Sequence, residues 1–306
     1  MTEQDYGGYQ VELSHTDKVF FPDARITKGE LLEYHERIAD IMLPHIQQRP
    51  LTLNRFPDGI GKEGFFQQSR GDYFPDWLDA LDVDHGGSTG HVEHMLANHQ
   101  ASLVYLVNQG TVSFHSWLSR TDHLKTPDQV IFDLDPPGSD FEPVRQAAHL
   151  VANGMRQCGL TPFVKTTGSR GLHVVAPLRP EADFEQVRSL ARALAQALAD
   201  AYPEQLTTEQ RKQKRRGRLY LDIMRNAFGQ TAVAPYSVRA KPHAPIATPL
   251  EWDELENQEL GPQRFTLANI FRRMGHRDDP WQDMHRKAVS IKTFEEGVSG
   301  LENEDL

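Results

Sequence analysis

The sequence predicts an α+β fold in which largely antiparallel sheets are flanked by helices. Segments with an apolar period of two, typical of half-buried strands, occur along the chain together with segments of helical period. Several strand segments follow one another with no helix between them, and two flank a short glycine-containing turn. A parallel, doubly wound sheet would need a crossover helix between successive strands, so an antiparallel arrangement is favoured.

The first half of the chain is expected to begin with a helix and continue with strands. Residues 27–30 read Thr-Lys-Gly-Glu, a capping box in which Thr27 and Glu30 bond to each other's backbone N–H groups. Apolar residues at helical spacing follow, and Pro44 lies near the expected end. Period-two segments then predict strands over residues 51–56, 103–107, 111–117 and 130–135.

The second half alternates helices with strands. A helix is expected to open at residues 139–142 and to end at Gly159, because glycine is favoured just beyond a helix end. Residues 248–251 read Thr-Pro-Leu-Glu, which predicts a further helix with proline in its first turn. Between these two helices we expect a hairpin of residues 163–166 and 172–176, a helix over about 183–201 and a strand over 219–224.

The domain organisation predicted from these elements is simple. Residues 1–10 are expected to form a flexible tail, residues 11–292 a single domain, and residues 293–306 an acidic C-terminal tail. Within the domain a division into lobes of about 11–120 and 121–292 is expected. Internal repeats and low-complexity tracts are absent from the sequence.

Composition excludes several classes of protein and site. No stretch approaches the roughly 18 apolar residues that cross a bilayer, and the N-terminus lacks the features of a signal peptide. A cytoplasmic protein without a membrane partner is therefore expected. Cys158 is the only cysteine, so an internal disulfide and a cysteine-based zinc site are both excluded. A metal would have to be held by oxygen or imidazole.

The net charge of -10 argues at first against a nucleic-acid partner, because phosphate contacts need lysine and arginine. Its distribution weakens this objection. Residues 251–306 carry thirteen acidic and seven basic side chains, which accounts for more than half of the excess. By contrast, residues 211–218 carry six positive charges. This basic run is either a solvated loop or a surface that follows a phosphate backbone.

Two strand segments carry acidic residues on the face opposite their apolar side chains. Asp133 and Asp135 alternate with apolar residues over 130–135, which places their carboxylates about 6.6 Å apart along a strand. Asp222 has the same setting in residues 219–224. If the strands are neighbours, three carboxylates converge, and oxygen ligands of this kind suit Mg²⁺ or Mn²⁺. Alternatively, the Asp-x-Asp pattern arises by chance, ends a strand, or holds one metal bound to a sugar nucleotide.

Several residues could hold the phosphates of a nucleotide. The turn 168–171 offers backbone N–H groups together with Ser169 and Arg170, and glycine at both ends allows an anion to approach. A purely structural hairpin would use glycine in the same way. Further candidates are His173 on the following strand, His115 on the strand 111–117, and the guanidinium groups of Arg225 and Arg239, although each could equally be an ordinary surface residue.

Lys28 occupies an unusual position for a lysine. It falls in the first turn of the capped helix, where a positive charge is mildly unfavourable against the helix dipole. An anion bound at that helix end would relieve the conflict, and Lys18 could close on the same phosphate.

Taken together, nine motifs resemble the polymerase domain of bacterial ligase D, a member of the archaeo-eukaryotic primase superfamily that acts in non-homologous end joining. The resemblance extends from about residue 13 to residue 291. Each motif alone is weak, but their order and combination are highly specific. The motifs are DKVFFP (17–22), TK (27–28), RFPDG (55–59), GFFQ (64–67), FH (114–115), IFDLDPP (131–137), TGSRGLH (167–173), YLD (220–222) and PYSVR (235–239).

The resemblance implies a primase-polymerase fold with an RRM-like catalytic module. It implies that Asp133, Asp135 and Asp222 hold two divalent ions, manganese or magnesium, and that His115, Ser169, His173 and Arg239 contact the incoming NTP or dNTP. Three further roles are implied for residues of the first lobe: Lys18 and Lys28 would bind the 5′-phosphate of the downstream strand, His15 stands where the family usually has asparagine in that pocket, and Phe65 or Phe66 would stack on template bases.

The expected function is therefore a metal-dependent polymerase that fills gaps and extends primer ends at DNA breaks, with a preference for ribonucleotides. Its expected partners are DNA with gaps, overhangs or double-strand breaks, a Ku-like end-binding protein, and a ligase in the same polypeptide or in another. Its expected location is the nucleoid in the cytoplasm. The alternatives are a DNA-end-bridging module without catalysis, a stand-alone primase, and a metal-dependent phosphohydrolase.

Overall fold

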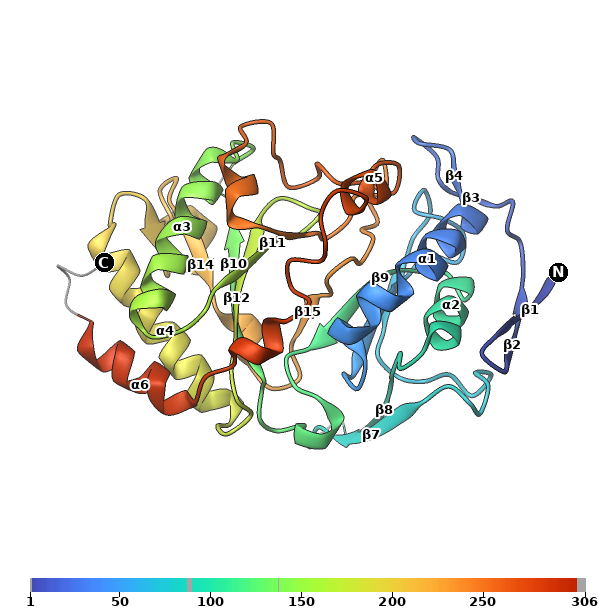
Figure 1. Ribbon diagram of the computed structural model, residues 1–306, viewed down its shortest axis with the longest axis horizontal. Coiled ribbons are helices and arrows are strands. Elements are labelled where there is room, and N and C mark those ends of the chain that lie inside the picture. Colours follow the sequence, from blue (N-terminus) through green and yellow to red (C-terminus); the bar gives the residue numbers. More distant parts are fainter. Residues whose placement is uncertain (1, 87–89, 137, 302–306) are drawn as a thin grey trace. The chain divides into compact units, whose positions relative to one another are not determined.

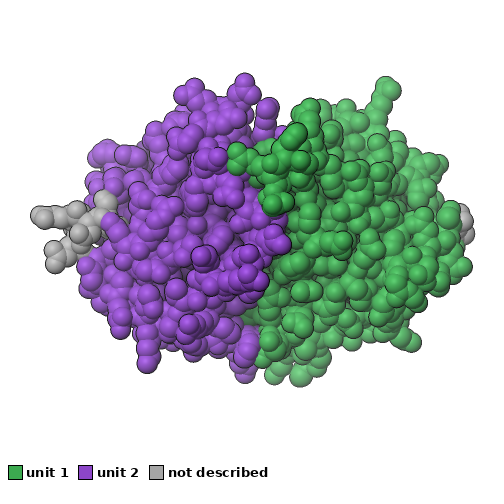
Figure 2. All heavy atoms as spheres, in the orientation of Figure 1, with its two compact units in different colours: residues 1–122, 231–247, 265–278 green, residues 123–230, 248–264, 279–306 purple. Residues whose placement is uncertain are grey.

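The computed structural model describes residues 2–86, 90–136 and 138–301 (Figure 1). The chain forms two compact units, coloured separately in Figure 2. Unit 1 comprises residues 1–122, 231–247 and 265–278, and unit 2 comprises residues 123–230, 248–264 and 279–306. The first change of unit, at residue 122, falls near the expected lobe boundary. The two later returns of the chain to unit 1 were not part of that expectation.

Unit 2 is built on a six-stranded sheet in the order β13-β14-β10-β12-β11-β16. All neighbours are antiparallel except β13 and β14, which are parallel. Figure 1 shows α3 (Glu142–Gln157) and α4 (Phe184–Ala201) against this sheet, and each contacts β10. The strands are β10 (Gln129–Asp135), β11 (Phe163–Thr166), β12 (Leu172–Pro177), β13 (Leu206–Thr207), β14 (Leu219–Asp222) and β16 (Pro249–Leu250).

Alternation along β10 separates a core face from a polar face. Val130, Phe132 and Leu134 are fully buried, whereas Asp133 and Asp135 alternate with them and remain partly exposed. Because successive side chains of a strand point to opposite faces, the two carboxylates lie on the face away from this apolar row. The alternation predicted from the sequence is therefore present.

Unit 1 is built on a four-stranded antiparallel sheet in the order β15-β9-β5-β6. The helices α1 (Lys28–Ile46) and α2 (Gln100–Asn108) pack against each other, and α2 also contacts β9. The strands are β5 (Leu51–Arg55), β6 (Phe65–Gln67), β9 (Thr111–Trp117) and β15 (Thr231–Val233), with three two-stranded ribbons formed by β1 (Thr2–Tyr6) and β2 (Tyr9–Leu13), β3 (Val19–Phe21) and β4 (Ile26–Thr27), and β7 (Ala80–Asp84) and β8 (His91–Met95).

Short elements complete the described chain. They are α5 (Ile270–Met274), α6 (Ile291–Gly300) and the 3-10 turns η1 (Thr121–His123), η2 (Lys212–Lys214), η3 (Met224–Asn226), η4 (Trp252–Glu256) and η5 (Met284–Lys287). Among the described residues, no helix combines the length and the apolar character needed to cross a membrane.

Most of the predicted elements are confirmed, and the α+β class with them. The capping box of α1 has both of its bonds, since Thr27 accepts the Glu30 N–H and the Glu30 carboxylate accepts the Thr27 N–H. The hairpin of β11 and β12 pairs as expected. Two predictions were wrong. Residues 103–107 lie within the helix α2, because a short apolar run, buried here except for Tyr105, has the same pattern in a strand and a helix.

The second wrong prediction is the helix after residues 248–251. Pro249 and Leu250 form the strand β16 at the sheet edge, and only the 3-10 turn η4 follows. The turn has its own capping box, in which Glu251 and Glu254 bond to each other's backbone N–H groups. Proline lacks an N–H, so an edge strand accepts it as readily as a first helical turn does.

Both expected tails contain regular structure. Residues 2–6 form β1 and pair with β2, and the hydroxyl of Tyr6 bonds to Glu36 on α1, which ties the ribbon to the unit. Residues 293–300 belong to α6, whose Ser290 cap accepts the Lys292 N–H. Residues 302–306 of the expected acidic tail, Met1 of the expected N-terminal tail and Pro137 of the IFDLDPP motif lie outside the described residues.

Candidate active site

Four side chains form a row across the sheet of unit 2. Asp133 of β10 stands directly opposite Asp222 of β14 on one side and His173 of β12 on the other. His173 in turn stands opposite Lys165 of β11. Directly opposite residues of antiparallel strands share a face, with Cβ atoms about 4.5–5.5 Å apart. The row therefore runs Asp222, Asp133, His173, Lys165, with Asp135 two residues further along β10.

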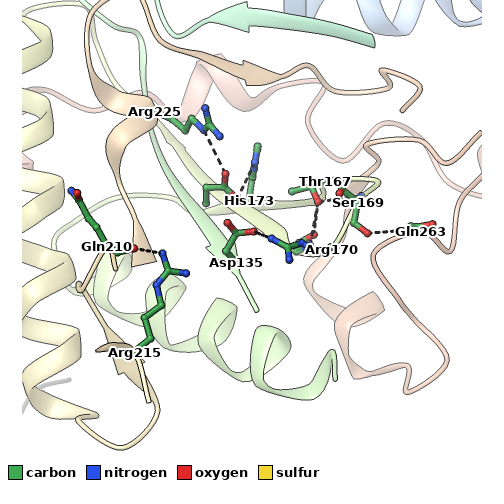
Figure 3. Close-up of polar contacts among 11 residues, drawn as sticks. Asp135, Thr167, Ser169, Arg170, His173, Gln210, Arg215, Arg225 and Gln263 are labelled. Atoms are coloured by element: carbon green, nitrogen blue, oxygen red, sulfur yellow. Dashed lines mark hydrogen bonds and ion pairs between the residues drawn. The ribbon is translucent and has the colours of Figure 1, made fainter. Parts of the chain in front are cut away.

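The Asp133 carboxylate lies between two nitrogen donors. Its Oδ1 is 3.4 Å from His173 Nε2, and its Oδ2 is 3.6 Å from Arg225 Nε (Figure 3). Burial by itself would raise the pKa of Asp133, but His173, Arg225 and Lys165 outweigh burial and hold the pKa at about 2. Burial, reinforced by the Lys165 charge, lowers the pKa of His173 to about 4. Near neutral pH the pair is therefore a carboxylate and a neutral imidazole.

The pKa values of the other two carboxyl groups, Asp135 and Asp222, are raised. Burial raises the pKa of Asp135, and the neighbouring Asp133 raises it further. The pKa of Asp222 is raised by burial above all, although the Met224 N–H, which donates to Asp222 Oδ1 at 2.8 Å, partly opposes the change. The charge of Asp133 thus disfavours ionisation of Asp135 and Asp222, and a cation placed among the three would relieve the repulsion.

The three carboxylates have the oxygen atoms that a hard divalent ion prefers, and the strand backbones place them near one another. Their oxygens are the ligands that Mg²⁺ and Mn²⁺ prefer, and two neighbouring strands carry them on one face. Within the described residues, no three acidic, histidine or cysteine side chains are gathered as a finished metal site. Asp133 faces Arg225, and Asp135 lies 3.5 Å from Arg170 Nη2. Binding would therefore require side-chain rotation but no change of strand register.

The turn between β11 and β12 is closed by its own hydrogen bonds. Thr167 Oγ1 accepts the N–H groups of Ser169 and Gly171 and donates to the Gly171 carbonyl. A Cβ at Gly171 would lie 1.9 Å from the Leu134 carbonyl oxygen, so only glycine fits there. The Ser169 carbonyl also accepts a bond from Gln263 (Figure 3). Ser169 and the exposed Arg170 are thus held beside the end of β10.

The basic run of residues 211–218 lies beside the same end of the sheet. Arg215 donates to the Gln210 carbonyl (Figure 3) and to the Glu209 carbonyl, and its guanidinium lies 4.1 Å from the centre of the Tyr220 ring. Tyr220 stands directly opposite Asp135. At least this arginine is therefore a fixed part of the surface around the acidic residues.

Sequence reasoning missed two residues of this region. Lys165 is 2% exposed and joins the row only through the pairing of β11 with β12, although a lysine inside a strand of otherwise buried residues was a visible signal. The buried Asn226 bonds to both polar backbone groups of Ile131 and so holds the segment after β14 against β10. Its position had no distinctive signal in the sequence.

The remaining predicted residues lie in unit 1. His115 of β9 shares a face of the sheet with Phe66, whose ring meets the imidazole edge-on at 5.9 Å between centres. Phe65 and Phe66 are 47% and 65% exposed, which is high for phenylalanine. Arg239 follows the isolated bridge between Val238 and Ile246, and its N–H donates to the Pro245 carbonyl.

His15, Lys18 and Lys28 are close together in unit 1. The buried Lys28 amine donates to the Ser14 carbonyl at 2.5 Å, and the Lys28 N–H bonds to the Lys18 carbonyl. Burial, with the nearby Lys18 charge, lowers the pKa of Lys28 to about 8. His15 has φ of 52°, a left-handed conformation in which asparagine and histidine are both over-represented. The backbone at position 15 therefore suits either histidine or asparagine.

The predicted residues therefore form two sets. Unit 1 holds His15, Lys18, Lys28, Phe65, Phe66, His115 and Arg239, and unit 2 holds Asp133, Asp135, Ser169, Arg170, His173, Asp222 and Arg225.

Comparisons with known proteins identify one group. The family model described as "LigD, primase-polymerase domain" matches residues 27–281. The bifunctional non-homologous end joining protein LigD of Bacillus subtilis is 31% identical over 279 residues, which cover 90% of this chain and 44% of that protein. The multifunctional protein LigD of Pseudomonas aeruginosa is 32% identical over 276 residues, 89% of this chain and 32% of that protein. This chain thus spans less than half the length of these relatives.

A solved structure shares the fold. The polymerase domain from Mycobacterium tuberculosis ligase D in complex with DNA superposes with a TM-score of 0.84 and 27% sequence identity. The match covers 91% of this chain and 99% of that one.

Proposed function

The chain belongs to the LigD primase-polymerase domain family, and on that premise we propose that it is a metal-dependent polymerase that fills gaps and extends primer ends at broken DNA. The reaction would join a nucleoside monophosphate from an NTP or dNTP to a primer 3′-hydroxyl, with release of pyrophosphate. The observation that carries the proposal is the pairing of Asp133 with Asp222, which places two carboxylates directly opposite each other and beside Asp135.

Asp133, Asp135 and Asp222 would hold two divalent ions, Mn²⁺ or Mg²⁺. Bound there, such ions would favour deprotonation of the 3′-hydroxyl and offset charge on the leaving pyrophosphate. His173, which lies 3.4 Å from Asp133 and is uncharged near pH 7 because of its pKa of about 4, would contact the incoming nucleotide. Asp133 and His173 stand directly opposite each other on β10 and β12.

Within unit 2, basic and hydroxyl groups would bind the nucleotide. Arg170 and Arg225 lie against the carboxylates, and a guanidinium can exchange a carboxylate partner for a phosphate with similar geometry. Ser169 on its hydrogen-bonded turn would complete this group. For unit 1, taken by itself, His115 and Arg239 are the residues proposed to contact a nucleotide. These assignments predict that each residue affects the KM for nucleotide more than the affinity for DNA.

The DNA itself would be held by unit 1. Lys18 and Lys28, with His15, would bind the 5′-phosphate on the far side of a gap. The Lys18 charge is near enough to lower the pKa of Lys28, and a phosphate would replace Asp58 as the partner of the Lys18 amine. Phe65 and Phe66 would stack on unpaired template bases, because exposed aromatic rings bind single strands in this way.

The proposal extends to the cellular setting. We propose that residues 11–292 act as one catalytic domain on broken DNA in the cytoplasm, at the nucleoid. A Ku-like protein would bring the domain to DNA ends, and a ligase in the same or another polypeptide would seal the product. A preference for ribonucleotides belongs to the same proposal.

The test is primer extension on a gapped duplex, with each nucleotide type and with Mn²⁺ or Mg²⁺. Replacing Asp133 with asparagine keeps the shape of the side chain but removes its charge, so Asp133→Asn should abolish extension while DNA binding persists. Asp200→Asn, at an exposed acidic residue of α4, is the matched control and should extend normally. Undiminished extension by Asp133→Asn would refute the assignment. DNA binding by the wild-type protein without any extension would favour an end-bridging module.

A further inference from the structure

Arg55 is the centre of a rigid aromatic cluster in unit 1. It stands opposite Phe65, which belongs to the edge strand β6, and its side chain is buried. Its Nε donates to the Gln109 carbonyl at 2.9 Å, and its Nη1 donates to the Tyr73 hydroxyl at 2.8 Å. The same guanidinium lies 5.4 Å from the centre of the Phe65 ring. One fixed cation therefore contacts both aromatic side chains.

Tyr73 is restrained but exposed. Beyond the bond to Arg55, its ring meets the buried Phe74 edge-on, with 4.7 Å between centres. Gly71 makes room for the ring, because a Cβ at that position would lie 2.7 Å from a Tyr73 ring carbon. Even so, Tyr73 is 63% exposed. An exposed tyrosine usually moves among rotamers, whereas this one is held by Arg55 and Phe74 with much of its surface in solvent.

The neighbouring aromatic residues extend along the same edge of the sheet. Phe66 lies on the face that carries His115, and Phe65 lies on the opposite face with Arg55. Phe65, Phe66 and Tyr73 are all exposed, and Phe65 and Tyr73 both contact the Arg55 guanidinium beside the edge strand β6. Separate flat faces of this kind suit successive unpaired bases, because every base can stack whatever its sequence.

We propose that Tyr73 is a third stacking position for the unpaired template strand, beyond Phe65 and Phe66. The inference rests on the proposed function, and it assigns a role to the RFPDG motif: Arg55 helps to hold the ring in place before DNA arrives. Holding a ring in its binding orientation lowers the entropy lost on association.

The experiment measures the affinity of the whole chain for fluorescent DNA without nucleotide. One substrate is a duplex with a single-stranded template overhang, and the control substrate is the same duplex with a blunt end. Tyr73→Ala and Tyr73→Leu should weaken overhang binding about fivefold or more, the range found when a stacked aromatic is removed, and leave blunt-end binding unchanged. Tyr73→Phe should lose less than either, because its ring still packs on Phe74 and Gly71.

A set of overhangs with one abasic site each then locates the contact. At one template position, loss of the base should remove the difference between the wild-type protein and Tyr73→Ala. Equal binding of the overhang by these two proteins would overturn the inference, as would an equal loss on blunt DNA or a loss in Tyr73→Phe as large as in Tyr73→Ala. A wild-type protein that binds the overhang but does not extend a primer would contradict the proposed function alone.

Discussion

The side-chain amide of Asn226 pairs with the backbone of Ile131. Its Oδ1 accepts the Ile131 N–H at 2.9 Å, and its Nδ2 donates to the Ile131 carbonyl at 2.7 Å and to the Ile223 carbonyl at 2.9 Å. β14 pairs with residues 133–135 of β10, and the Asn226 amide supplies the bonds that a neighbouring strand would otherwise make to Ile131. In this way it fixes Arg225 and the preceding Asp222 relative to Asp133.

Asn226→Ala should therefore lower both stability and primer extension. The substitution leaves buried backbone groups of Ile131 without partners, at a cost of about 1–3 kcal/mol in the free energy of unfolding. Denaturant unfolding measures the first effect and steady-state extension the second. Asn153→Ala, on the exposed side of α3, is the control and should change neither. Normal extension by a clearly destabilised Asn226→Ala would show that the amide does not position the carboxylates.

Gly171→Ala should disrupt the turn of residues 168–171, which is proposed to bind the nucleotide. The new methyl group would lie 1.9 Å from the Leu134 carbonyl oxygen, so the turn or the end of β10 must move. Overpacking of this kind costs about 1–3 kcal/mol, and extension should fall with the displacement of Ser169 and Asp135. Gly138→Ala is the matched control, since a Cβ there has no neighbour within 4 Å among the described residues. Thermal unfolding measures the loss of stability, and the KM for nucleotide measures the effect on binding. Wild-type values of both for Gly171→Ala would contradict the prediction.

Recognition of a 5′-phosphate should weaken as the pH rises through about 8. The lowered pKa of Lys28 means that the free protein carries this positive charge below pH 8 and loses it above. The ratio of affinities for phosphorylated and unphosphorylated gaps should therefore be larger at pH 7 than at pH 9. Lys28→Ala should show a low ratio at both pH values, whereas Lys62→Ala, at an exposed lysine, should behave like the wild type. A pH-independent ratio in the wild-type protein would exclude Lys28 from the pocket.

Acid should destabilise unit 1 through His35. Burial lowers the pKa of this fully buried histidine from 6.5 to about 4, so the folded state binds its proton less readily than the unfolded state does. Its contribution to stability is complete above pH 6.5 and is lost progressively as the pH falls to about 4, to the extent of about 3 kcal/mol.

His35→Leu offers the test, because leucine of similar size cannot take up a proton. Urea unfolding at several pH values should show a smaller loss of stability between pH 6.5 and 4 in this variant than in the wild-type protein. His123→Leu, at a histidine that is not buried, should retain the wild-type slope. Identical slopes for His35→Leu and the wild type would mean that His35 does not control acid sensitivity.

Local pattern was enough to predict the parts of the fold that depend on neighbouring residues. The capping box of Thr27 and Glu30 and the alternation around Asp133 and Asp135 are present as expected, because such signals involve residues only a few positions apart. Local pattern failed for residues 103–107, where burial of all but Tyr105 removes the difference between a strand and a helix. It failed again at Pro249, whose missing N–H suits two kinds of structure.

By itself, the sequence determined that carboxylates, glycines and basic groups occur in settings suited to a nucleotide and metal ions, and its combined motifs identified the family. Only the tertiary structure decided which of these groups are neighbours. Asp222 meets Asp133, and Lys165 joins their row, through the order and register of β14, β10, β12 and β11. Register depends on how whole strands bury their apolar faces against α3 and α4, and that packing is a property of the assembled sheet which no short segment contains.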